Sequence, residues 1–386
     1  MKAVEVKKDI YWVGTIDWNV RNFHGYLTQQ GTTYNAYLII DEKITLVDTA
    51  KADFSDELIS RISEIIDPSK IDYIIANHVE MDHSGSLDKI LELSPNAEII
   101  TCAKGEKGIK RHHKKDWKFK VINSGDSLSL GKHSLQFITT PMVHWPDNMV
   151  AYMPEEKILF SNDSFGQHYA STERFDDECE LDIVMNEAKK YYANIVMPYD
   201  KPTQNELAAV SKLDIEMVLP SHGIIWRKHL DIILAAYNDW AFSKNKKKVA
   251  IVYDTMWKST EKMAKVVYNA FENKGFQIKF INLQHRHISD ILTDVLDSSH
   301  IAVGSPTLNK NIMPSVAAFL TYLSGLSAGG KKAVIFGSYG WGDKSIPQLT
   351  KYMEEAKYDI IYSSKIQFIP DEEELTQLQQ ELEAVI

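Results

Sequence analysis

Short apolar runs separated by polar turn residues dominate the N-terminal part of the chain. Residues 10–14 (IYWVG), 34–40 (YNAYLII) and 43–50 (KITLVDTA) have the length and the β-branched and aromatic content of strands. The pattern continues at residues 72–78, 97–102, 118–123, 133–140, 149–154 and 157–163. Residues 54–66 (FSDELISRISEII) instead have apolar positions at helical spacing. Mixed strands and helices of this kind predict an α/β sandwich.

The C-terminal part has a different rhythm, in which almost wholly apolar strands alternate with helices. The strands are expected at residues 247–255, 277–283, 300–307 and 332–340. Residues 259–275 (STEKMAKVVYNAFENKG) have the spacing of an amphipathic helix. This alternation predicts a parallel, doubly wound sheet with helices on both faces.

A lysine-rich stretch at residues 243–248 (SKNKKK) separates the two patterns and follows the apolar helical segment at 229–242. A polar stretch beside a helix end is a reasonable linker. We therefore expect two domains, residues 1–248 and residues 249–386. The alternative is a surface loop inside one larger domain.

Four side chains able to bind a metal fall within six positions directly behind the strand pattern at 72–78. Three further candidates each follow another apolar run and stand beside Gly, Pro or Asn, as residues of a strand-end loop would. The full set is His78, Glu80, Asp82, His83, His144, Asp163 and His222. Any one of these histidines alone is more often a hydrogen-bonded core or surface residue. Together, four imidazoles and three carboxylates suffice for two metal ions with one carboxylate bridging, and the agreement of their contexts favours that site.

The spacing H-x-E-x-D-H differs from the H-x-H-x-D-H of binuclear zinc hydrolases in one residue, Glu80. A carboxylate is a harder, anionic ligand that suits iron and stabilises its oxidised state. Zinc has no redox chemistry and would support only Lewis-acid hydrolysis. Glu80 thus favours a redox metal, and a two-zinc hydrolase is the alternative.

Hydroxyl and aromatic residues fill the loop after the first C-terminal strand. Hydroxyls next to free backbone N–H groups at a helix start form an anion cradle. The loop is neither G-x-G-x-x-G nor G-x-x-x-x-G-K, so a dinucleotide or ATP is not expected. It resembles the FMN phosphate loop of flavodoxins, although Lys258 stands where those loops have Gly.

Two more strand-end loops would meet this loop at the switch point of the sheet. The expected FMN-binding residues are Thr255, Met256, Trp257, Lys258, Ser259 and Thr260 in the first loop, Ser305, Pro306, Thr307, Leu308 and Asn309 in the second, and Ser338, Tyr339, Gly340, Trp341, Gly342 and Asp343 in the third. Trp257, Tyr339 and Trp341 are candidates to cover the flavin ring, and packing in the protein core is the alternative for these aromatics.

The metal motif and the flavodoxin-like loops together closely resemble the flavodiiron proteins over the whole chain. The resemblance implies a metallo-β-lactamase-like αββα domain followed by a flavodoxin-like domain. It implies one iron at His78, Glu80 and His144, a second at Asp82, His83 and His222, and Asp163 bridging. FMN would relay electrons to this diiron centre, which would reduce O₂ to water, NO to N₂O, or both.

The same resemblance implies partners and further residues. His24 and Tyr191, or its neighbour Tyr192, resemble family residues near the diiron pocket. An external donor, rubredoxin or a deazaflavin coenzyme, would supply the electrons. The family also implies a head-to-tail homodimer, or a pair of such dimers.

Composition limits the remaining function classes. A formal charge of −10 argues against general nucleic-acid binding, and no apolar stretch approaches the ~18 residues that a membrane span needs. Two cysteines are too few for a disulfide framework or a protein-held iron–sulfur cluster, so we expect a cytoplasmic protein. Residues 104–120 are strongly basic, which indicates a solvated helix face or a docking patch for an acidic electron carrier. A flavin electron-transfer or sensor module with a vestigial metal site is a further alternative.

Overall fold

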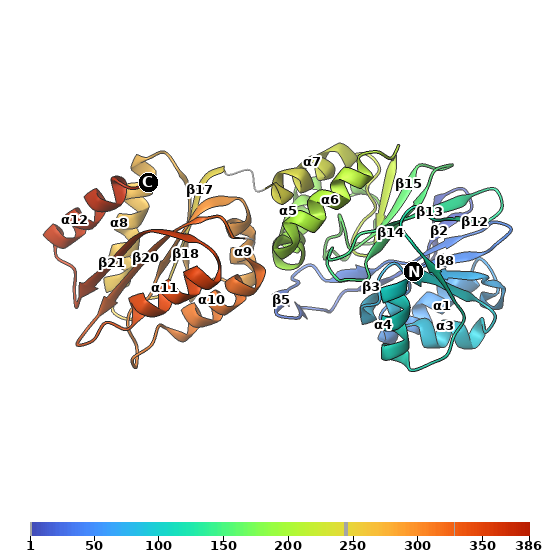
Figure 1. Cartoon of the computed structure of the whole chain (residues 1–386), viewed down its shortest axis with the longest axis horizontal. Coiled ribbons are helices and arrows are strands. Elements are labelled where there is room, and N and C mark those ends of the chain that lie inside the picture. Colours follow the sequence, from blue (N-terminus) through green and yellow to red (C-terminus); the bar gives the residue numbers. More distant parts are fainter. Residues whose placement is uncertain (1, 243–245, 328) are drawn as a thin grey trace. The chain divides into compact units, whose positions relative to one another are not determined.

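The computed structural model describes residues 2–242, 246–327 and 329–386 (Figure 1). The chain divides into two compact units: Met1–Tyr191 with Lys201–Ala241, and Tyr192–Asp200 with Phe242–Ile386. Within the described residues, the first unit contains two large sheets and two short strand pairs, and the second contains one sheet.

The first sheet of the first unit has the strand order β1-β2-β7-β8-β9-β10-β11. Its strands are β1 (Val4–Lys7), β2 (Ile10–Trp12), β7 (Tyr37–Ile39), β8 (Thr45–Val47), β9 (Tyr73–Ile75), β10 (Glu98–Cys102) and β11 (Phe119–Ile122). The second sheet has the order β12-β13-β14-β15-β16, with β12 (Ser127–Ser129), β13 (Ser134–Thr139), β14 (Met149–Met153), β15 (Ile158–Asn162) and β16 (Met217–Pro220). Two short antiparallel pairs stand beside them, β3 (Thr15–Asp17) with β6 (Thr32–Tyr34) and β4 (Asn22–Phe23) with β5 (Tyr26–Leu27).

Alternation along the strands of the first sheet assigns each of its faces to a different core, because successive side chains point to opposite sides. Ile39 and Ile75 belong to a core shared with residues of the second sheet such as Phe137. Their neighbours Leu38 and Ile74 belong to a second core, which they share with residues of helices α1, α3 and α4. The first unit is therefore a sandwich whose central core lies between two sheets.

Helices cover the outer faces of this sandwich. α1 (Ser55–Ser63), α3 (Leu87–Leu93) and α4 (Ala103–His113) lie on the first sheet, and Figure 1 shows α5 (Leu181–Tyr191), α6 (Asp200–Val210) and α7 (Leu230–Ala241) beside the second. The short α2 (Met81–Ser84) follows β9. The αββα architecture expected from the sequence is confirmed.

The second unit contains one fully parallel sheet in the order β18-β17-β19-β20-β21. Its strands are β17 (Lys246–Tyr253), β18 (Gln277–Asn282), β19 (Ser298–Gly304), β20 (Lys332–Tyr339) and β21 (Asp359–Gln367). Its helices are α8 (Ser259–Asn273), α9 (Ile288–Leu296), α10 (Pro314–Leu326), α11 (Ser345–Glu355) and α12 (Glu372–Glu383). α8 and α12 share a core with one face of the sheet. This order is that of the doubly wound flavodoxin fold, as expected.

The expected domain ranges, 1–248 and 249–386, stay a prediction, and the division by contacts differs from them in two places. The π-helical turn η4 (Tyr192–Val196) packs against α9 and α10, so residues 192–200 group with the second unit. β17 already begins at Lys246, which shortens the expected linker. Residues 243–245 of that linker lie outside the described residues.

None of the helices within the described ranges combines the length and the apolar character that crossing a membrane requires.

Candidate functional sites

The seven predicted metal ligands gather at one edge of the first unit. His78 follows β9, and Glu80, Asp82 and His83 stand at or in α2. The other three follow strands of the second sheet: His144 comes after β13, Asp163 after β15 and His222 after β16. β13 and β15 are both antiparallel to β14, and β16 is parallel to β15. The carboxyl ends of these three strands therefore lie at the same edge, which brings their ligands together.

Asp163 occupies the centre of the cluster. Its Oδ2 lies 3.3 Å from His144 Nε2 and 3.8 Å from His78 Nε2. Its Oδ1 lies 3.1 Å from His83 Nε2 and 3.6 Å from His222 Nε2. Each carboxylate oxygen thus faces a different pair of histidines, which is the arrangement of a carboxylate shared between two cations.

The remaining two carboxylates are divided between the two halves of the cluster. Glu80 Oε2 lies 3.4 Å from His78 Nε2 and 3.5 Å from His144 Nε2. Asp82 approaches the other pair, with Oδ1 3.4 Å from His83 Nε2 and Oδ2 3.3 Å from His222 Nε2. The grouping agrees with the two iron positions that the family resemblance implies.

Two of the histidines are oriented by groups that can only accept a hydrogen bond. His78 Nδ1 lies 2.9 Å from Asp147 Oδ2, and His222 Nδ1 lies 2.7 Å from the carbonyl oxygen of Thr33. Because a carboxylate and a carbonyl accept, Nδ1 must carry the hydrogen in both rings. In the neutral ring that binds a metal, Nε2 then presents its lone pair to the centre of the cluster.

Asp48 supports the metal-ligand loop through the residue that precedes His78. It contacts no ligand side chain; instead it accepts hydrogen bonds from the Asn77 backbone N–H at 2.9 Å and from the Asn77 side chain at 3.0 Å. Since Asn77 immediately precedes His78, Asp48 fixes the backbone on which that ligand stands.

The electrostatics of the cluster suit cations. Burial would lower the pKa of His83, but Asp82 and Asp163 beside it raise that pKa to about 9. Burial would likewise raise the pKa of Asp163, yet the neighbouring His83 and His144 hold it well below its usual range. A proton on His83 thus offsets the charge of Asp82 and Asp163 when no metal does so, and a metal ion would displace it.

Buried polar atoms without hydrogen-bond partners also indicate a cation site. Among the described residues, both oxygens of Asp163 and Oδ1 of Asp82 are buried without a hydrogen-bond partner. Leaving such atoms unpaired costs about 1–3 kcal/mol each, which coordination of a cation would offset. The mixed imidazole and carboxylate donor set fits iron better than zinc.

The three residues predicted near the metal pocket lie in different surroundings. His24, in the turn between β4 and β5, is 76% exposed and its Nε2 lies 3.4 Å from Glu80 Oε1. Tyr191 is buried, and burial and then the charge of Asp163 raise the pKa of its hydroxyl. Tyr192 instead donates a hydrogen bond to Asp200 at 3.1 Å. Of the two tyrosines, only Tyr191 is thus placed to act on the cluster.

His168 is a site residue that we did not predict. It is fully buried, its ring centroid lies 4.9 Å from that of His222, and its Nδ1 lies 2.8 Å from Thr32 Oγ1. Burial, followed by the charge of His222, lowers its pKa well below the usual value, so the ring is neutral. Asp147 was also missed, and its only sequence signal was its place three residues after His144 in the same loop.

The predicted flavin loops follow β17, β19 and β20, which are neighbours in the parallel sheet. Their carboxyl ends therefore share one edge. Thr260 Oγ1 lies 2.8 Å from Ser338 Oγ, and the Thr307 backbone N–H donates to the Ser338 carbonyl at 2.9 Å. Hydrogen bonds thus join all three loops into one cradle at the N-terminus of α8.

Several features of this cradle fit a phosphorylated, aromatic ligand. Thr255 is nine-tenths buried, yet its hydroxyl has no partner among the described residues. Trp257 and Trp341 are 90% and 98% exposed, so neither belongs to the core. Lys258, the N-cap residue of α8, has φ 68°, the left-handed conformation that favours glycine.

The predicted FMN-binding residue Asn309 lies in a tight turn. Asn309 and Lys310 have φ of 49° and 64°, and the backbone groups of Leu308 and Asn311 bond to each other across them. This is a tight turn of the kind that asparagine favours, so the Asn309 backbone has a structural reason of its own. Phe368, which was not predicted, lies beside Gly340 and is 61% exposed.

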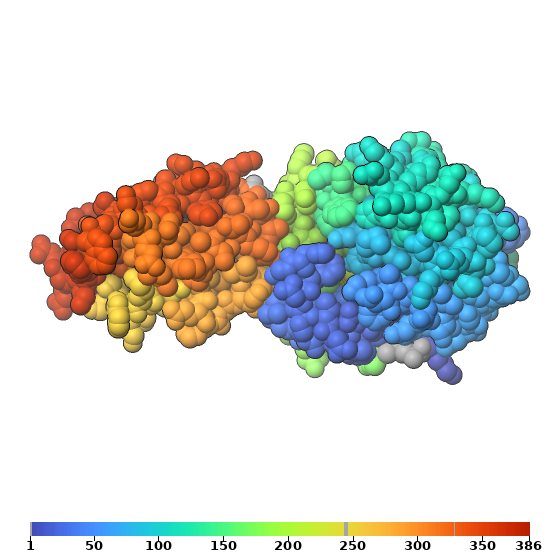
Figure 2. Space-filling view, turned by 90° about the horizontal axis from the view of Figure 1, so that it is seen from below, coloured from blue at the N-terminus to red at the C-terminus, as the bar shows by residue number. Residues whose placement is uncertain are grey.

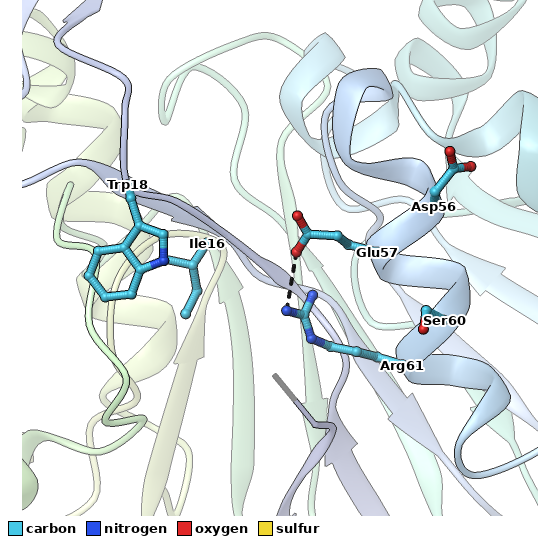
Figure 3. Close-up of a pocket in the computed structure, with 6 residues that line it drawn as sticks. All are labelled: Ile16, Trp18, Asp56, Glu57, Ser60 and Arg61. Atoms are coloured by element: carbon cyan, nitrogen blue, oxygen red, sulfur yellow. Dashed lines mark hydrogen bonds and ion pairs between the residues drawn. The ribbon is translucent and has the colours of Figure 1, made fainter.

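A separate pocket of about 530 Å³ lies between β3 and α1 (Figure 3). It is lined by Ile16, Trp18, Asp56, Glu57, Ser60 and Arg61. Figure 3 shows Glu57 and Arg61, both from α1, joined by an ion pair. Their distance is 3.2 Å, and Arg61 also donates to the Gly14 carbonyl at 2.7 Å. Its charged groups are thus already paired, and none of the predicted ligands reaches it.

Comparison with known proteins agrees with both domains. Residues 32–223 match the family described as ODP family beta lactamase, and residues 251–380 match flavodoxin. The nitric oxide reductase of Moorella thermoacetica is 43% identical over 97% of this chain and 96% of its own length.

Two solved structures resemble the whole chain. The rubredoxin oxygen:oxidoreductase of Desulfovibrio gigas has a TM-score of 0.96 and 39% identity, covering 100% of this chain and 98% of that one. The flavodiiron protein of Giardia intestinalis has a TM-score of 0.95 and 35% identity, covering 100% and 96%.

Proposed function

The chain belongs to the flavodiiron protein family, and from that premise we propose that it reduces dioxygen to water, nitric oxide to nitrous oxide, or both. The relatives named nitric oxide reductase and rubredoxin oxygen:oxidoreductase support the reaction class. The Glu80 carboxylate among the ligands supports iron over zinc at the site.

The observation that carries the proposal is the position of Asp163 between two pairs of histidines. Its two oxygens would hold two irons side by side, so that one small gas molecule meets both. His78, Glu80 and His144 would complete one site, and Asp82, His83 and His222 the other. When bound, FMN would supply electrons that the iron pair passes to the gas.

The chain's own residues would control the protons that these reductions consume. Tyr191 keeps its proton because burial and Asp163 raise its pKa, so its hydroxyl can donate a hydrogen bond to a bound gas molecule. His24 stands at the exposed side of Glu80, where it would take protons from solvent. His168, neutral and packed against His222, would hold that ligand in place.

In the second unit, the hydroxyls of Thr255, Ser259 and Thr260 and the N-terminus of α8 would hold the FMN phosphate. Trp257 and Trp341 would cover the flavin ring. The donor would be a rubredoxin-type carrier, in line with the printed name of a relative, with a deazaflavin coenzyme as the other candidate. Both cysteines are free, which fits the reducing cytoplasm.

The test is consumption of each gas by protein loaded with iron and FMN and fully reduced without oxygen. We expect rapid reoxidation by O₂, by NO, or by both, and an iron content near two per chain. Slow reoxidation by both gases, or zinc as the metal acquired during correct maturation, would overturn the proposal.

We propose further that two chains form a head-to-tail dimer in which the FMN of one serves the irons of the other. Exposed Trp18 and Met81 in the first unit, and Trp257 and Trp341 in the second, supply apolar surface that such a dimer would bury. A dimer of two dimers would satisfy the same requirement.

Complementation separates this arrangement from electron transfer within one chain. Asp163→Ala should lack the iron pair, and Thr255→Asp should exclude FMN by placing a carboxylate where the phosphate would bind. Neither homodimer should consume gas. A heterodimer of the two should recover up to half of the wild-type activity, because one chain's FMN then meets the other chain's irons. An inactive heterodimer would exclude the head-to-tail arrangement.

A further inference from the structure

One exposed surface of the first unit is strongly basic on a chain that is otherwise acidic. Eight cations lie on α4, on the loop after it and on β11, and all of their side chains are exposed. They are Lys104, Lys107, Lys110, Arg111, Lys114, Lys115, Lys118 and Lys120, here called the basic surface. Only two carboxylates, Glu106 and Asp116, lie in the same stretch, while the whole chain carries a formal charge of −10. Figure 2 shows the turquoise part of the chain, to which α4 and β11 belong, at the surface.

The charges of the basic surface are largely free. Within the described residues, Lys110 is the one member with an ion-pair partner, Glu106 at 2.7 Å. A surface built only to solvate a helix commonly pairs its charges at i and i+4. Seven unpaired cations instead leave a positive field that reaches about 10 Å into solvent at 0.1 M salt.

The opposite side of α4 packs directly on the metal-ligand loop. A Cβ added at Gly108 would lie 2.8 Å from Val79 Cγ2, and Val79 stands between the ligands His78 and Glu80. The residue that caps α4, Cys102, donates from its thiol to the carbonyl of Asp147 at 3.1 Å, and Asp147 in turn holds His78. The basic surface is therefore separated from the metal-ligand loop by the width of one helix, about 10 Å.

His113 of this segment has a structural role. His113 Nδ1 lies 2.6 Å from Asp88 Oδ2 on α3, and its ring contacts Trp117. This pair ties the end of α4 to the body of the unit, so the segment is a fixed surface.

We propose that the basic surface docks a small acidic protein that carries one electron at a time. The proposal rests on the redox function proposed above, which requires an external donor. An acidic partner is repelled by most of this chain and attracted here, and complementary charge raises the rate of productive encounter. Each encounter oxidises one reduced donor by one electron, and two encounters match the two-electron capacity of a bound FMN.

The experiment uses the loaded full-length protein and a reduced, acidic rubredoxin as the probe. Stopped-flow mixing without oxygen gives the second-order rate of rubredoxin oxidation at low and high salt. The triple variant Lys107→Glu, Arg111→Glu, Lys115→Glu reverses the basic surface. Lys8→Glu, Lys132→Glu, Lys212→Glu is the matched control, because it changes the net charge equally through exposed lysines of the same unit.

We expect the wild-type and control rates to be high at low salt and to fall roughly tenfold or more as salt rises. The reversed variant should start at least about tenfold lower and show little salt dependence. Equal rates for the reversed and control variants would overturn the proposal. So would basic-surface binding to nucleic acid or anionic vesicles without any effect on rubredoxin oxidation.

Two further measurements keep the outcomes separate. Gas consumption driven by a photochemical reductant should be the same in all three proteins, and its absence in the wild type would contradict the proposed function and leave the docking result standing. Thermal unfolding should also coincide. If the glutamate variant unfolds early, the corresponding glutamine variant, which removes charge without reversing it, must still slow rubredoxin oxidation by several-fold.

Discussion

The metal cluster and the flavin cradle differ in how their residues are arranged. In the metal cluster, seven side chains from loops far apart in sequence converge, and all but Glu80 and His144 are buried. In the flavin cradle, three loops of neighbouring parallel strands contribute hydroxyls and backbone groups, and the large aromatics are exposed. The first site depends on individual atoms and the second on a shared surface. Single substitutions should therefore be drastic in one site and graded in the other.

Removing the central carboxylate should have the largest effect. Asp163→Ala takes away both oxygens that face the four histidines, so we expect no gas consumption and little bound iron. The visible FMN spectrum should be unchanged, because FMN binds in the other unit. Metal analysis and a gas electrode check both outcomes, with Asp182→Ala on the surface as control. Retained turnover would refute the role of Asp163.

Weakening the support of one ligand should have the next largest effect. In Asp147→Asn the partner of His78 Nδ1 loses its charge, which makes the imidazole a poorer donor. We expect a 10- to 100-fold loss of iron affinity, roughly what such outer groups contribute. Competition with a chelator measures it, and Asp116→Asn is the exposed control. An unchanged affinity would mean that Asp147 matters only for folding.

Two adjacent tyrosines provide a matched pair with a smaller expected effect. Tyr191→Phe removes the hydroxyl beside Asp163, and Tyr192→Phe removes one that is bound to Asp200. We expect the first to slow gas consumption about tenfold, the worth of one hydrogen bond of ~1.4 kcal/mol, with iron and FMN content unchanged. The second should leave the rate alone. The reverse result would assign the role to Tyr192.

A substitution in the flavin cradle should have small effects of opposite sign on stability and on FMN affinity. Lys258→Gly relieves a left-handed residue, so the FMN-free protein should gain roughly 1 kcal/mol in unfolding free energy. The loss of a cation beside the phosphate should weaken FMN binding about two- to fivefold at low salt.

Lys258→Met separates the effect of the backbone strain from the effect of the charge, because it removes the charge and keeps the strain. Denaturant unfolding and fluorescence titration of FMN measure them. A glycine variant that binds FMN as tightly as the wild type would show that the lysine charge does not contribute to FMN binding.

The fold class and the gathering of the seven candidate ligands could be predicted because their sequence signals are local. His78 to His83 are adjacent, and the other ligands each follow a recognisable strand. Their supports are not local: Asp147 reaches back 69 positions to His78, and the Thr33 carbonyl meets His222 across 189. Only the folded loops reveal such pairs.

The elements that escaped prediction each have a physical cause. β21 is an edge strand with mixed exposure along its length, so its apolar pattern is weak. Residues 192–200 group with the second unit through packing that no periodicity encodes. The strand at 72–78 was predicted too long, because the backbone must leave β9 after Ile75 to present His78.

The glycine at position 108 has a consequence for how this chain can diverge. The inward side of α4 has no room for a larger residue at this position, since a side chain there would press on Val79, which stands between the predicted ligands His78 and Glu80. Its outward side is free to change sign or composition at little cost. Substitutions on the exposed side of this one helix could therefore change which electron-donor protein docks, while the metal cluster beneath it stays the same.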